Sequence, residues 1–137
     1  SCQDDLVWAD HIVFIYPIWW GSYPALLKGY LDTVFMSRFA YKYKKFWPID
    51  IPKGLLKGKS ARIIQTSGGP NILAWPLFGS LFGTVYPGER ALRDGTLRFC
   101  GIFNVKISRL DNLQNNASQK RIQKFLRKVY RLGSKHK

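Results

Sequence analysis

The segment that decides the fold is residues 12–32, IVFIYPIWWGSYPALLKGYLD. Its first part, Ile12–Tyr16, is a short apolar run rich in β-branched and aromatic residues, which is typical of a buried strand. Pro17 has no N–H to donate to a sheet, so we expect the strand to end there. Pro24 suits the first position of a helix, since its φ is fixed and its missing N–H costs nothing there. The segment therefore predicts a strand, a loop and a helix in succession.

The predicted helix runs from Pro24 to Met36. Its apolar residues recur at helical spacing and so share one face: Leu27, Tyr30, Leu31, Val34 and Phe35. The loop before it, Ile18–Tyr23, contains two adjacent tryptophans and a glycine. In open α/β sheets, ligands bind at the carboxyl ends of the strands. This loop is therefore the first place to look for a functional site.

Two more strands and two more helices are expected further along the chain. Ala61–Thr66 and Phe103–Leu110 have the composition or alternation of strands, and Glu89–Cys100 and Ser118–Gly133 have helical patterns. Strands that alternate with helices predict a parallel sheet with helices packed on its faces. We expect a single α/β domain that comprises residues 1–137.

Two segments are expected to lack regular structure. Residues 37–57 are aromatic and basic, and Pro48 and Pro52 are expected to break any strand or helix there. Residues 71–88 combine aromatic residues with glycines and prolines in a loop-like pattern. Gly101, in contrast, is placed to end the helix that precedes it.

The charge balance is strongly basic, with 22 Lys and Arg against 8 Asp and Glu and a formal net charge of +14. A field of this sign attracts phosphates of any kind. Much of the charge lies in the last predicted helix, where it is interpreted as a solvated face; contact with nucleic acid is the alternative. No motif typical of nucleic-acid binding accompanies it, so no nucleic-acid partner is predicted.

The cysteines and the hydropathy pattern restrict the class of protein further. Cys2 and Cys100 lie far apart, with no second Cys or His at metal-ligand spacing, so we expect a reduced, cytoplasmic protein without a metal site. No apolar run reaches the roughly 18 residues that a membrane span needs. No membrane span is predicted.

Two loops follow predicted strands and carry the candidate binding residues. They are Pro17-Ile18-Trp19-Trp20-Gly21-Ser22 and Thr66-Ser67-Gly68-Gly69-Pro70. If the two strands are neighbours, both loops open on the same edge of the sheet and face each other. The glycines allow a planar ligand to approach the backbone closely, and the indole rings would wall in an apolar ring system such as a flavin. The alternative is that the tryptophans are core residues and the glycines only form turns.

Several motifs in this order resemble the flavodoxin-like NAD(P)H:quinone oxidoreductases. They are Trp8–Phe14, Pro17–Gly21, Pro24–Asp32, Phe39–Tyr41, Leu55–Lys59, Thr66–Gly69 and Phe99–Ile102. The resemblance implies a flavodoxin-like three-layer α/β/α fold with a parallel sheet. It also implies a bound FMN or FAD, NAD(P)H as co-substrate, a homodimer, and two-electron transfer to a quinone or similar acceptor. FMN and FAD, like NADH and NADPH, stay open as alternatives.

The resemblance also assigns roles to the two loops. Backbone groups of Pro17, Ile18, Trp19, Trp20 and Gly21 would contact the isoalloxazine ring, with an N–H near Gly21 close to the flavin N5. The N–H groups of Thr66, Ser67, Gly68 and Gly69 would face the pyrimidine edge of the ring. The cofactor supplies the hydride chemistry in such enzymes, so no catalytic side chain is assigned.

The resemblance covers the C-terminal two thirds of the family's fold. A flavodoxin-like sheet has five strands in the order 2-1-3-4-5, and this chain is expected to supply the last three, with strands 1 and 2 missing from it. Two alternatives to the enzyme are a regulatory or ancillary subunit of a potassium-efflux system, with a peripheral membrane-protein partner, and a non-catalytic flavodoxin-like fragment.

Overall fold

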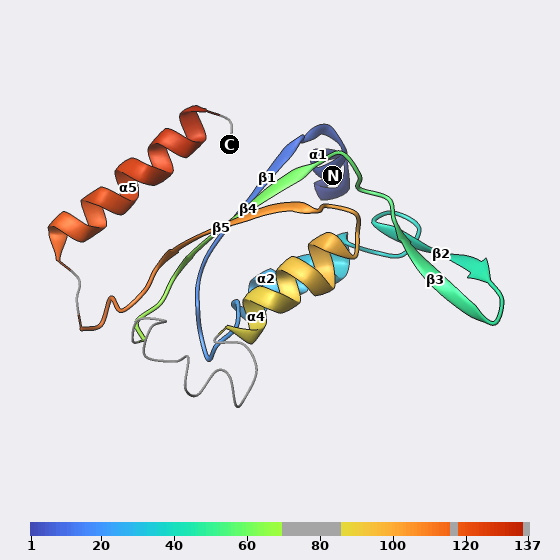
Figure 1. Cartoon of the computed structure of the whole chain (residues 1–137), viewed down its shortest axis with the longest axis horizontal. Coiled ribbons are helices and arrows are strands. Elements are labelled where there is room, and N and C mark those ends of the chain that lie inside the picture. The colour runs from blue at the N-terminus through green and yellow to red at the C-terminus, as the bar shows by residue number, and fades with distance from the viewer. Residues whose placement is uncertain (70–85, 116–117, 136–137) are drawn as a thin grey trace.

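A three-stranded parallel sheet forms the centre of the molecule (Figure 1). The computed structural model describes residues 1–69, 86–115 and 118–135. The strands are β1 (His11–Pro17), β4 (Ser60–Thr66) and β5 (Asn104–Leu110), and they lie in the order β1-β4-β5. All three predicted strands are confirmed, with ends within one residue of the expected ones. Their order is that expected for the last three strands of a flavodoxin-like sheet.

Two helical segments cover one face of this sheet: α2 (Ala25–Val34) and the continuous helix formed by α4 (Pro87–Arg90) and η2 (Ala91–Arg98) (Figure 1). The register aligns Phe14 with Ile63 and Ile63 with Ile107, so these side chains share the covered face. They pack with Leu31 of α2 and with residues of η2 in a single apolar core. Residues at the alternate positions of β1 point the other way, and Val13 and Ile15 are 47% and 73% exposed.

A short helix, α1 (Cys2–Trp8), precedes β1. Ser1 and Asp4 form a reciprocal capping box that satisfies backbone donors at its first turn. Leu6 is buried, and the Gln3 side-chain amide donates to the carbonyl oxygen of Val34 at 3.1 Å. The helix is therefore held against the end of α2.

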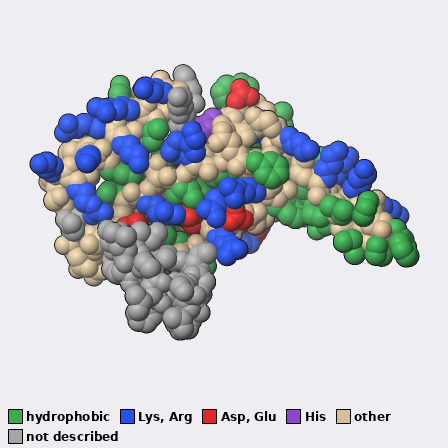
Figure 2. Space-filling view, in the orientation of Figure 1, with side chains coloured by type: hydrophobic (Ala, Val, Ile, Leu, Met, Phe, Trp, Pro, Cys, Tyr) green, Lys and Arg blue, Asp and Glu red, His purple; other side chains and the backbone are tan. Residues whose placement is uncertain are grey.

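The prediction that residues 37–57 lack regular structure is wrong. This segment forms an antiparallel hairpin of β2 (Tyr41–Phe46) and β3 (Ile49–Gly54) that projects from the body of the molecule (Figure 1). Prolines disrupt strands inside a sheet, but each strand of a two-stranded ribbon has an outer edge that needs no donor. Pro48 lies in the turn and Pro52 lies on such a strand. In Figure 2, hydrophobic side chains line one side of the hairpin and lysines the other.

The helix predicted for Glu89–Cys100 is present, but it begins at Pro87 and is wider over Ala91–Arg98, where it is a π-helix. Gly95 lies in the wide segment, and the Thr96 hydroxyl donates to the carbonyl oxygen of Ala91, five residues earlier, at 3.3 Å. Gly101 follows with a φ of +100°, a conformation that favours glycine, and ends the helix as predicted.

The last helix, α5 (Gln119–Ser134), begins after Ser118 as predicted, but it differs from the expectation in its packing. No residue within its described range is buried, and a hollow of about 790 Å³ separates it from the end of β5 at Arg109 and Leu110. Its sequence has many cations and no Asp or Glu. Closing the hollow would remove water from several cations without a carboxylate on the helix to compensate them, which is costly.

Neither a membrane span nor a metal centre is found over residues 1–69, 86–115 and 118–135. No helix there is long and apolar enough to cross a bilayer. No group of three or more His, Cys, Asp or Glu side chains in that part of the chain is placed to hold a metal ion.

Candidate functional site

The two candidate loops lie side by side because β1 and β4 are adjacent and parallel. Pro17 is paired with Thr66 at the ends of the two strands. The backbone N–H of Ile18 donates to the carbonyl oxygen of Thr66 at 2.7 Å. The segments that follow β1 and β4 therefore leave the sheet at the same edge, as the sequence predicted.

A hollow of about 580 Å³ lies between the two loops. Nine of its lining residues are the nine predicted from the sequence, and three others complete the wall: Pro17, Ile18, Trp19, Trp20, Gly21, Thr66, Ser67, Gly68 and Gly69, with Tyr86, Leu113 and Gln114. The volume is within the range of small-molecule and cofactor sites. None of the described lining residues is acidic, so no carboxylate of the wall opposes an anionic ligand.

The first loop is a tight reverse turn. The N–H of Trp19 donates to the carbonyl oxygen of Ser22, and the N–H of Ser22 donates to that of Trp19, both at 2.9 Å. The two central residues, Trp20 and Gly21, have φ values of +52° and +74°, as a type I′ turn requires. A tryptophan in this conformation costs about 1 kcal/mol, and such strain is concentrated at functional sites.

The tryptophans of this loop are surface residues. Trp19 is 60% exposed and Trp20 is fully exposed. The alternative interpretation, that both are core residues, is therefore wrong. Their rings are available to a ligand at the rim of the hollow.

The second loop is fixed by the segment that follows β5. The N–H of Ser67 donates to the carbonyl oxygen of Leu110 at 3.1 Å, and the N–H of Leu113 donates to that of Ser67 at 3.0 Å. Within the loop, the N–H of Gly69 donates to the Ser67 hydroxyl at 3.1 Å. This loop is therefore ordered by backbone contacts before any ligand is present.

Tyr86, Leu113 and Gln114 were not among the predicted site residues. The Tyr86 hydroxyl donates to Oδ1 of Asp111 at 3.1 Å. Burial raises the pKa of the Tyr86 phenol, and the Asp111 carboxylate adds to this effect, so the hydroxyl remains a donor at neutral pH. All three residues reach the hollow through tertiary contacts, and no local motif indicates them. Pro70 of the second loop and the rest of residues 70–85 lie outside the described residues.

The arrangement suits a flat ring with one polar edge. Gly21 has a backbone conformation that side chains rarely adopt, and Gly68 has only the Gln114 side chain within 4 Å of a Cβ built on it, so both allow close approach to the backbone. The first loop supplies apolar and indole surface, and the second supplies backbone and hydroxyl groups. The nine predicted residues therefore line one hollow that offers both an apolar surface and a polar edge.

Comparison with known proteins places this arrangement in a family. A family model described as flavodoxin-like fold matches residues 1–132. The chain therefore belongs to the flavodoxin-like family. An uncharacterized NAD(P)H oxidoreductase of Haemophilus influenzae is 38% identical over 107 residues, which cover 76% of this chain and 47% of that protein.

Two further proteins are similar to this chain. FMN-dependent NADH:quinone oxidoreductase 3 of Bacillus cereus is 44% identical over 61 residues, or 44% of this chain and 27% of that protein. A crystal structure of Smu.1420 from Streptococcus mutans superposes with a TM-score of 0.77 at 39% identity and covers 96% of this chain and 63% of that one. The chain spans less than half the length of these two oxidoreductases.

Proposed function

We propose that this chain carries the ring-binding part of an FMN-dependent NAD(P)H:quinone oxidoreductase. The observation that supports this most directly is the convergence of all nine predicted residues on one hollow of about 580 Å³. The similar Bacillus cereus protein is named as FMN-dependent and as acting on NADH and quinone. FMN is therefore the cofactor we propose, with FAD as the alternative, and a quinone-like molecule is the acceptor.

The residues of the chain would bind and orient the cofactor. When bound, FMN supplies two-electron hydride chemistry between NAD(P)H and a quinone. Residues 17–21 would hold the ring through backbone and apolar contacts, and Thr66–Gly69 would hold its polar edge. Tyr86, whose hydroxyl is fixed by Asp111, would close the wall beside the second loop.

Titration of the chain with FMN, followed by the quenching of flavin fluorescence, tests this proposal. We expect saturable binding, and we expect Trp20→Ala to weaken it about fivefold, equivalent to loss of one aromatic contact of ~1 kcal/mol. Because Trp20 is fully exposed, its replacement should leave the unfolding temperature almost unchanged. NADH oxidation in the presence of FMN and a quinone provides the functional measurement.

Trp8→Ala is the matched control, since Trp8 is 85% exposed on α1 and is absent from the lining of the hollow. Its affinity for FMN should equal that of the unchanged chain. A chain that binds neither FMN nor FAD would contradict the proposal.

We further propose that the protein forms a homodimer through the projecting hairpin. Phe46, Trp47 and Ile49 at its tip are all more than 60% exposed, and apolar patches of this kind mark protein contacts. We expect light scattering to give twice the mass of one chain. Trp47→Ser together with Phe46→Ser should shift the mass to that of a monomer, whereas Leu26→Ser on α2, 89% exposed in the chain, should not. A monomeric unchanged chain would contradict this proposal.

We also propose a cytoplasmic location. Cys2 and Cys100 are both free thiols, one exposed and one buried, which fits a reducing compartment. Burial raises the pKa of the Cys100 thiol to about 11, so it stays protonated and unreactive at neutral pH.

A further inference from the structure

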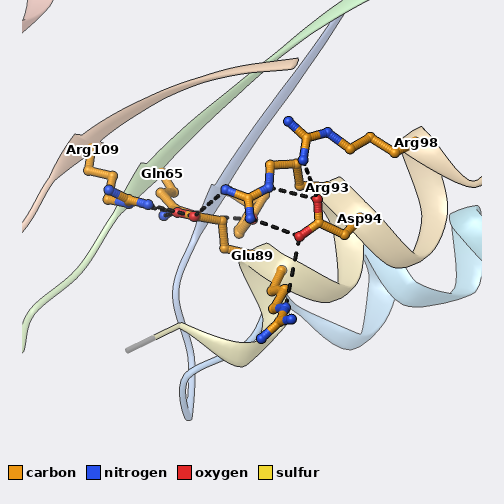
Figure 3. A network of polar contacts seen from close by, with 8 residues as sticks. Gln65, Glu89, Arg93, Asp94, Arg98 and Arg109 are labelled. Atoms are coloured by element: carbon orange, nitrogen blue, oxygen red, sulfur yellow. Dashed lines mark hydrogen bonds and ion pairs between the residues drawn. The ribbon is translucent and has the colours of Figure 1, made fainter. Parts of the chain in front are cut away.

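A row of polar side chains crosses the sheet directly behind the candidate site. Tyr16, Gln65 and Arg109 are register neighbours on β1, β4 and β5, so their side chains share one face of the sheet. This is the face that α4 and η2 cover, and Glu89 of α4 reaches the row from the helix side (Figure 3). The four residues come from four separate elements.

The side chains form one continuous chain of hydrogen bonds. The Tyr16 hydroxyl donates to Oε1 of Gln65 at 3.0 Å, and Nε2 of Gln65 donates to Oε2 of Glu89 at 2.5 Å. Arg109 donates to both carboxylate oxygens of Glu89, from Nε at 2.6 Å and from a terminal guanidinium nitrogen at 2.5 Å. Gln65 is completely buried, and Tyr16 and Glu89 are nearly so.

Glu89 determines which group donates and which accepts in each of these hydrogen bonds. A carboxylate paired with arginine only accepts hydrogen bonds, so the Gln65 amide must turn its NH₂ group toward Glu89. The amide oxygen of Gln65 must then face Tyr16, whose hydroxyl donates to it. One ionised group thereby fixes the orientation of two side chains on two strands.

Each member of the row is next to a segment that lines the candidate site. Tyr16 directly precedes the first loop, and Gln65 directly precedes the second. Glu89 follows Gly88, whose N–H donates to the carbonyl oxygen of Gly21 at 3.0 Å. The Arg109 guanidinium lies 5.8 Å from the centre of the Tyr86 ring. Glu89 is therefore connected to both loops and to Tyr86, which also lines the hollow.

Stability alone does not account for this ion pair, in which Glu89 is nearly buried and the Arg109 side chain is 31% exposed. Removing a carboxylate from water is expensive, and well-packed apolar residues in place of such a pair are often equally stable or more so. What a hydrogen-bonded network adds is a fixed geometry, because its members satisfy one another in only one arrangement. A site that must hold a ring between two loops needs that geometry within about 0.5 Å.

We propose that Glu89 is the positioning residue of the candidate site. It holds the two loops and Tyr86 at a fixed separation before the ligand binds, acting through Gln65 and Arg109. Its effect on flavin binding rests on the proposed function, whereas its effect on the loops does not.

Asp94 provides a matched comparison on the same continuous helix. It is also an acid bound by arginines: Arg93 and Arg98 each approach it to 2.8 Å, and Arg90 approaches it to 3.9 Å (Figure 3). These three arginines belong to the same helix as Asp94, and Asp94 is absent from the lining of the hollow between the two loops. Arg93, which binds Asp94, also lies 4.0 Å from Glu89, but Asp94 makes none of the hydrogen bonds of the row. Asp94→Asn therefore makes the same chemical change as Glu89→Gln and leaves those hydrogen bonds in place.

Amide hydrogen exchange on the ligand-free chain tests the inference. In Glu89→Gln, we expect exchange at the N–H groups of Ile18, Ser22 and Ser67 to become at least tenfold faster, since the two loops lose their common anchor. In Asp94→Asn, these rates should stay within twofold of those of the unchanged chain. Equal rates in the two variants, or a uniform increase over the whole sheet in Glu89→Gln, would overturn the inference.

Tyr16→Phe tests the network without removing a charge, so it also decides the matter if Glu89→Gln does not fold. It should accelerate exchange at Ile18 about threefold, and adding Glu89→Gln should give no more than the effect of Glu89→Gln alone. If the effects of the two substitutions on the exchange rate at Ile18 instead multiplied in the double variant, Tyr16 and Glu89 would act independently, which would contradict a single connected network.

FMN titration of the same variants separates this inference from the proposed function. We expect about tenfold weaker binding in Glu89→Gln and unchanged binding in Asp94→Asn. If the unchanged chain binds no flavin but the exchange rates follow the expected pattern, the positioning role is supported and the flavin site is refuted. If the chain binds FMN and Glu89→Gln alters neither affinity nor exchange, the positioning role is refuted and the flavin site is supported.

Discussion

Replacing Gly54 with alanine is expected to lower the free energy of unfolding by about 3 kcal/mol, the upper part of the range for overpacking a close contact. A Cβ atom at this position would lie 2.3 Å from the carbonyl carbon of Cys100 and 2.3 Å from the nitrogen of Gly101. Both are backbone atoms, so no side chain can turn away to make room. Urea unfolding followed by circular dichroism measures the change.

The close approach of Gly54 to Cys100 and Gly101 matters because it joins the base of the β2–β3 hairpin to the end of η2. Close to Gly54, the N–H of Leu56 donates to the carbonyl oxygen of Cys100 at 2.9 Å. A displaced Gly54 would strain this bond as well, and Leu56 is part of the core.

Gly29→Ala is the control for Gly54→Ala. Gly29 lies within α2 and has nothing within 4 Å of a built Cβ. Alanine there should raise the free energy of unfolding by up to about 1 kcal/mol, because it is the better helix former. If Gly54→Ala were as stable as the unchanged chain, the close approach of the hairpin base to Cys100 would be wrong.

Gly88→Ala is expected to weaken FMN binding at least tenfold and to cost about 2 kcal/mol of stability. Its Cβ would lie 2.4 Å from Cα of Ser22 and 2.6 Å from the Ser22 hydroxyl oxygen. Ser22 closes the turn that presents Trp20 and Gly21 to the hollow. The turn must therefore move away from the helix, and the wall that it forms moves with it. Flavin fluorescence titration and thermal unfolding give the two measurements.

Gly95→Ala separates this effect from a general effect on the helix. Gly95 lies in η2, and a built Cβ at that position has nothing within 4 Å. We expect its affinity for FMN to equal that of the unchanged chain. An equal loss of affinity in Gly88→Ala and Gly95→Ala would show that the contact with Ser22 is not the cause.

The strands and the two loops were predicted correctly because their causes are local or follow from topology. The apolar run before Pro17 and the run before Ser67 define strands by composition alone. Once two strands are parallel neighbours, the loops at their carboxyl ends must meet. This is why nine residues from two distant segments could be assigned to one hollow before the structure was known.

The hairpin and the wide helix could not be predicted in the same way. Pro48 lies in the turn between the two strands, and Pro52 is acceptable on a strand only because each strand of the ribbon has an outer edge. The π-helical segment around Gly95 depends on how η2 fits against the core, where Leu92 and Leu97 are completely buried. Propensity rules carry no information on such a fit.

The sequence by itself determined the three parallel strands and the two loops of the candidate site, and its motifs resembled those of the flavodoxin-like class. The strands and loops follow from periodicity, from proline and glycine positions, or from the geometry of parallel sheets. Only the tertiary structure decided how the loops are held, since Gln65, Glu89 and Arg109 are separated along the chain and meet only in the folded state. Hydrogen bonds between buried groups depend on positions in space, which no local pattern specifies.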